Sequence, residues 1–140
     1  MRRVLRPGGT VAITVWAGAS EFFISLAGAL SRHVSEEVGR KSLAPFKYAG
    51  ITTLSDRLSD IGFEEVGVQK LSVVREIYDP ETAIPKEILA NPVGPEVSQA
   101  GPAVMRQIVD DVLSDLAHCI DGPKLIAPQV ANLIAGKACN

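Results

Sequence analysis

The feature that most constrains this chain is a sharp turn followed by a strand near its start. Pro7-Gly8-Gly9 ends a helical turn that carries the cations Arg3 and Arg6. The two glycines allow the positive φ angles that a tight helix-to-strand reversal uses. Residues 10–16 follow, rich in β-branched side chains and apolar apart from two threonines. Because this segment lacks alternation of apolar and polar residues, it predicts a strand covered on both faces, as in an α/β sheet.

The same region resembles a known family. Residues Met1 to Ala12 contain the pattern R-x-L-x-P-G-G followed by an apolar run, and they resemble the segment that leads into strand five of class I S-adenosylmethionine-dependent methyltransferases. The resemblance continues in order through Val15-Trp16, Glu21-Phe22-Phe23, Ala44-Pro45-Phe46, Ile61-Gly62-Phe63 and Ile126-Ala127-Pro128. The ordered pieces cover nearly the whole chain, so it resembles the C-terminal half of such an enzyme.

The resemblance implies a fold. It is α/β, a partial Rossmann-like methyltransferase fold over residues 1–140 as a single domain, with about three strands packed with four to five helices. The last strand, which begins near Leu125, should lie antiparallel between the first two. Residues 79–121 should form a helical insert. The apolar spacing after Ser20 further predicts a helix from Glu21 to about Glu37, with Gly39 as its stop signal.

The resemblance also implies what this chain lacks. Complete members hold S-adenosylmethionine with a glycine-rich loop after strand one, an acidic residue ending strand two, and residues near the ends of strands three and four. All of these precede the Pro-Gly-Gly turn, so we expect no cofactor-binding residue here and no S-adenosylmethionine bound by the chain alone. Met1 falls where complete members have the inside of a helix, which suggests a late reading-frame start or a split or degraded copy.

In the resembled family, the loop after strand five and the start of the next helix lie near the methyl-acceptor pocket. By that resemblance, Trp16, Phe22, Phe23 and Phe46 are the predicted substrate-pocket residues, for a small apolar acceptor. The alternative is that these aromatic side chains belong to the core. We assign no catalytic residue, because methyl transfer depends mainly on the alignment of acceptor and cofactor.

Two histidines and two cysteines remain. His33 and His118 are predicted to lie on helices, without a paired carboxylate at a sequence spacing that would suggest a catalytic dyad. Cys119 is predicted to lie on an apolar helix face and Cys139 in the C-terminal tail. No zinc-ligand spacing or CxxC motif occurs among them. The sequence therefore predicts no metal site, and it gives none of these four residues a role.

Composition limits the partners. The chain has 14 basic and 16 acidic residues and a formal net charge of −2, which gives no electrostatic reason to bind nucleic acid or an anionic membrane. It has neither an apolar run of membrane-spanning length nor a secretory signal, so a cytoplasmic location is expected.

The strand at residues 11–16 carries a further expectation. Its apolar edge and the adjacent helices should pair, either in a homodimer or with a separate N-terminal half. Two functions follow from the sequence. One is the C-terminal portion of a methyltransferase, inactive without the cofactor-binding half. The other is a non-catalytic binding or dimerisation module derived from that fold.

Overall fold

The computed structural model describes residues 2–139, so the expectation about Met1 lies outside the described residues. The chain forms two compact units that alternate along the sequence. The first comprises the residues up to Gly18, Tyr48–Val73 and the residues from Val130 onward. The second comprises Ala19–Lys47 and Val74–Gln129.

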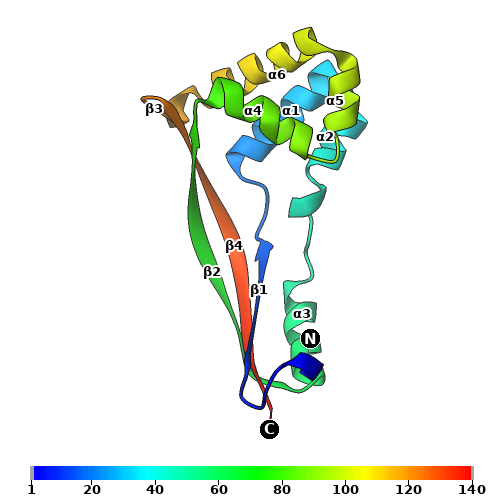
Figure 1. Ribbon diagram of the computed structural model, residues 1–140, viewed down its shortest axis with the longest axis vertical. Coiled ribbons are helices and arrows are strands. Elements are labelled where there is room, and N and C mark those ends of the chain that lie inside the picture. The colour runs from blue at the N-terminus through cyan, green and yellow to red at the C-terminus, as the bar shows by residue number, and fades with distance from the viewer. Residues whose placement is uncertain (1, 140) are drawn as a thin grey trace. The chain divides into compact units, whose positions relative to one another are not determined.

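The strands form an antiparallel sheet. Its strands are β1 (Thr10–Trp16), β2 (Phe63–Tyr78), β3 (Ile120–Asp121) and β4 (Lys124–Ala138). The order is β1-β4-β2, with the short β3 paired to β4 (Figure 1). The last long strand therefore lies between the two earlier ones and runs antiparallel to β1, as predicted.

The first unit is built around the predicted turn. Gly8 has a φ of +73°, its N–H donates to the Ala138 carbonyl at 2.9 Å, and the Ala138 N–H donates to the Gly9 carbonyl at 2.8 Å. From this turn, β1 pairs with β4 in a continuous register from Thr10 opposite Lys137 to Trp16 opposite Ala131. The turn thus places the start of β1 beside the end of β4.

One helix, α3 (Ile51–Asp60), packs on this part of the sheet. The core that it shares with the strands contains Val11, Leu58, Phe63, Ile134 and Ala138. On β1 the side chains alternate: Val11 is buried, whereas Thr10, Ala12, Thr14 and Trp16 are exposed. The prediction of a strand covered on both faces is therefore wrong for the described residues, since α3 covers one face only.

The second unit is mainly helical. Its elements are α1 (Glu21–His33), α2 (Glu36–Ser42), η2 (Ala44–Phe46), α4 (Pro80–Ala90), α5 (Gly94–Ala100), α6 (Pro102–Asp115) and η3 (Ala117–Cys119). The segment predicted as a helical insert at residues 79–121 holds α4, α5, α6 and η3. The largest fully buried side chains of this unit include Phe22, Leu26, Leu30, Ile84, Ile88, Ile108, Leu116 and Leu125.

The helix predicted to reach Glu37 is two helices. α1 ends at His33, and Ser35 caps α2, since its Oγ accepts a hydrogen bond from the Val38 N–H at 3.2 Å. Gly39 lies inside α2 rather than at a helix end, and a Cβ built there would lie 2.5 Å from the Ala27 carbonyl oxygen of α1. The described residues contain six α-helices and four strands, instead of four to five helices and about three strands.

Candidate functional site

Three of the four predicted pocket residues lie together in the second unit. The Phe22 and Phe23 rings at the start of α1 meet edge to face, with centroids 5.1 Å apart and planes at 80°. The Phe46 ring in η2 lies 4.5 Å from Phe23. Phe22 and Phe23 are only 2% and 8% exposed, so both belong to the core, whereas Phe46 is half-buried. Trp16, the last residue of β1, belongs to the first unit and is 36% exposed.

A cation covers these rings. The Arg75 guanidinium lies 5.9 Å from the Phe22 centroid and 6.0 Å from the Phe23 centroid, within the range of cation–π attraction. The same group forms an ion pair with Glu87 of α4. Sequence reasoning missed Arg75, because its position in β2 does not reveal which rings it meets. The cluster thus combines aromatic packing with a cation that is paired to a carboxylate.

A hollow of about 310 Å³ lies on the sheet of the first unit. Its lining includes the exposed Thr10 of β1 and the small residues Gly67 and Ala135, which leave the surface low. A salt bridge of 2.6 Å between Lys137 Nζ and Glu65 Oε2 borders it. None of the predicted pocket residues lines this hollow. Side chains of a helix or strand that covers the sheet at this place can fill this shallow hollow.

His33 joins α1 to α6. Its Nε2 lies 2.9 Å from Asp111 Oδ2, and the Arg32 guanidinium donates to the same oxygen at 2.8 and 3.0 Å. The hydrogen bond from His33, followed by that from Arg32, lowers the pKa of Asp111. The carboxylate partner of His33 comes from a different helix, so the spacing along the sequence did not reveal it.

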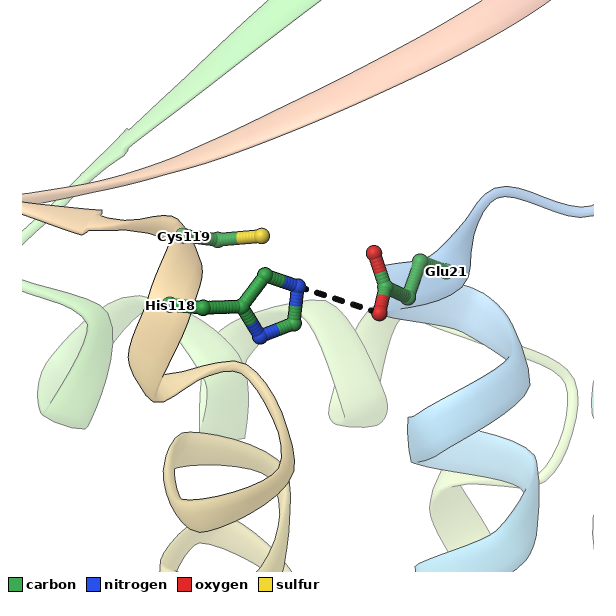
Figure 2. Close-up of side chains that lie close together, drawn as sticks. All are labelled: Glu21, His118 and Cys119. Atoms are coloured by element: carbon green, nitrogen blue, oxygen red, sulfur yellow. Dashed lines mark ion pairs between the residues drawn. The ribbon is translucent and has the colours of Figure 1, made fainter.

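His118 and Cys119 lie beside the first residue of α1. Figure 2 shows the His118 ring and the Cys119 side chain pointing toward Glu21. His118 Nε2 lies 3.2 Å from Glu21 Oε1, a carboxylate that the spacing along the sequence also did not reveal. Burial first, and then the charge of Glu21, raise the pKa of the Cys119 thiol. Cys119 lies in η3, where it packs partly against the core.

The comparisons add no family. No protein-family model matches the sequence, and a search of curated proteins finds no match. Within residues 2–139, no helix is long and apolar enough to cross a membrane.

Proposed function

We propose that this chain is the acceptor-side part of a class I S-adenosylmethionine-dependent methyltransferase that acts on a small molecule. The strand order carries the proposal. β1 follows the Pro-Gly-Gly turn, β2 comes next in sequence, and the antiparallel β4 returns between them. The resembled family orders its last three strands in the same way, in a Rossmann-like sheet. The chain supplies none of the cofactor loops, so the proposal makes it inactive without a cofactor-binding part.

The uncovered side of β1 supports this proposal. β1 is an edge strand of the described sheet, and Thr10, Ala12, Thr14 and Trp16 are exposed on one of its faces. Its sequence is nevertheless typical of a strand buried on both faces. A cofactor-binding part would place a strand beside the open edge of β1 and a helix across its exposed face. Side chains of that helix would fill the 310 Å³ hollow.

A second copy of the chain fits less well. Two β1 strands paired edge to edge would extend the sheet and satisfy the open backbone groups. The face that carries Thr10, Ala12, Thr14 and Trp16 would stay uncovered, because edge pairing leaves both faces of a sheet as they were. We therefore assign this surface to a cofactor-binding half, and we make the homodimer an outcome of the test.

The predicted substrate-pocket residues differ in how far their side chains are exposed. Phe22 and Phe23 are too buried to contact a ligand unless α1 moves, so we give them the role of supporting Phe46 from the core. Phe46, half-buried on Phe23, remains as the candidate contact for a small apolar acceptor, whereas Trp16 belongs to the first unit and is not assigned to the same site. The role of Phe46 is to hold the acceptor in line with the cofactor's methyl group, which is the main requirement of methyl transfer.

The test is a chimera. Residues from Arg3 onward replace the segment that follows strand four in a class I methyltransferase of known structure, and S-adenosylhomocysteine is titrated calorimetrically into the chimera and the 140-residue chain. We expect saturable binding of one ligand by a monomeric chimera, and none by the chain alone. A chimera that folds but binds nothing would refute the proposal. A stable dimer of the chain in sedimentation would then favour the dimerisation module.

The backbone offers a matched variant. The Ala17 N–H donates to the Val130 carbonyl, so the odd-numbered residues of β1 point their N–H groups toward β4 and the even-numbered ones toward the open edge. Thr14→Pro removes an outward N–H and should leave the chain folded while it prevents ligand binding by the chimera. Val15→Pro removes a bond to β4 and should unfold both. Normal binding by the Thr14→Pro chimera would contradict pairing at this edge.

A further inference from the structure

We propose that Glu21, His118 and Cys119 form a binding site for a divalent transition-metal ion, with Zn²⁺ as the best match. The three side chains offer a carboxylate oxygen, an imidazole nitrogen and a sulfur, the ligand types that zinc uses in proteins. A thiolate excludes Mg²⁺ and Ca²⁺, which take oxygen ligands. The proposal is independent of the methyltransferase proposal.

The ligand atoms are close enough for one ion. One atom from each of the three side chains lies within 4.8 Å of the other two. Glu21 Oε1 and His118 Nε2 are 3.2 Å apart. Two ligands at about 2.0 Å from a tetrahedral zinc ion lie about 3.3 Å apart, so this pair already has the required separation. To complete the set, the Cys119 sulfur, which lies within 4.8 Å of the other two ligand atoms, must come to about 3.5 Å from each of them.

Buried neighbours hold the two segments that supply the ligands. Glu21 is the first residue of α1 and is followed by Phe22, which is 2% exposed. His118 and Cys119 are consecutive in η3, and the Cys119 N–H donates at 2.8 Å to the carbonyl of Leu116, which is 1% exposed. The backbone positions are thus set by the core of one compact unit, a form of preorganisation that metal sites need.

Access and coordination number follow from exposure. The Glu21 and His118 side chains are 62% and 60% exposed, so an ion can enter from solvent without displacing the fold. The three protein ligands leave one tetrahedral position for water, as in open zinc sites. An exposed histidine–carboxylate pair by itself stabilises a fold very little, so stability alone does not explain the arrangement.

Charge gives the site a pH dependence. Zinc binds cysteine as the thiolate, and its charge would offset that of the Glu21 carboxylate. Binding should therefore release a proton from Cys119, and the apparent affinity should rise with pH.

Co²⁺ is the probe, because it replaces Zn²⁺ in tetrahedral sites and a thiolate ligand gives a charge-transfer band in the near ultraviolet. We expect the full chain to bind one Co²⁺ with this band, and Zn²⁺ to displace it. Cys119→Ser should abolish the band. His118→Ala and Glu21→Gln should each weaken the apparent affinity about tenfold or more, since each removes one ligand.

The chain contains its own controls. Cys139→Ser and His33→Ala remove the same two residue types at positions outside the cluster, and they should titrate as the parent chain does. Far-ultraviolet circular dichroism confirms that each variant is folded. The proposal is refuted if the folded parent chain shows no thiolate band at mildly alkaline pH. It is also refuted if the band survives in Cys119→Ser or disappears in Cys139→Ser.

Discussion

Gly39→Ala tests the close packing of α1 on α2. Gly39 lies inside α2, where alanine normally stabilises a helix by about 1 kcal/mol relative to glycine. Here a Cβ would lie 2.5 Å from the Ala27 carbonyl oxygen and would also meet the Ser31 Oγ, whereas real Cβ contacts stay beyond 3.0 Å. The Ser31 side chain can rotate away, but the carbonyl belongs to the backbone of α1.

The expected change in the free energy of unfolding is the gain in helix propensity minus the cost of the contact with the Ala27 carbonyl. Relief of the contact requires a separation of at least about 0.5 Å between packed helices, and overpacking of a core costs about 1–3 kcal/mol. Because the obstructing atom is backbone, we take a cost of about 3 kcal/mol; after the gain in helix propensity, the net loss is about 2 kcal/mol. With a urea m-value of about 2 kcal/mol per molar, the unfolding midpoint should fall by about 1 M.

Gly28→Ala is the matched control. Gly28 lies in α1, and its added Cβ would meet only the Arg32 Nη1, at an ordinary 3.6 Å. This variant should gain up to about 1 kcal/mol from helix propensity. Urea unfolding followed by circular dichroism measures both variants. A Gly39→Ala chain as stable as Gly28→Ala would refute the packing argument.

Three other predictions concern single groups. Gln129 is 5% exposed, and its Nε2 has no hydrogen-bond partner among the described residues. Gln129→Met should therefore raise the free energy of unfolding by about 1 kcal/mol, measured by thermal melting. A loss of stability in this variant would contradict the missing hydrogen bond. The pKa of Asp111 is lowered below its ordinary value of 3.8, so its contribution to stability is present above that pH and is lost as the pH falls through the lowered pKa. Urea midpoints of the parent and Asp111→Asn should therefore converge below about pH 4, and a constant difference would exclude this linkage. Trp16 is the chain's single tryptophan and is 36% exposed, so its fluorescence should shift to the blue in the chimera; an unchanged spectrum would show that the Trp16 face stays open.

The local features were predictable because a few neighbouring residues determine them. Pro7-Gly8-Gly9 set the turn into β1, and the observed φ of Gly8 is the positive angle that this turn requires. The position of the last strand between the first two came from the resemblance alone. The prediction that Gly39 ends a helix is wrong, because glycine marks a helix end where its φ is positive. Here Gly39 permits α2 to approach α1 closely, a reason that only the packed structure contains.

The unpredicted chemistry comes from contacts between distant segments. The carboxylates that contact His33 and His118 come from distant segments: α6 brings Asp111 to the first and α1 brings Glu21 to the second. Motif reading detects ligand sets whose members are close in sequence, so it excluded a metal where the fold joins Glu21 to His118 and Cys119. An ion at this cluster would crosslink the helix that follows β1 to η3, in the segment predicted as an insert. It would thus stabilise the second unit whether or not the chain has a methyltransferase partner, because both ends of the crosslink belong to that unit.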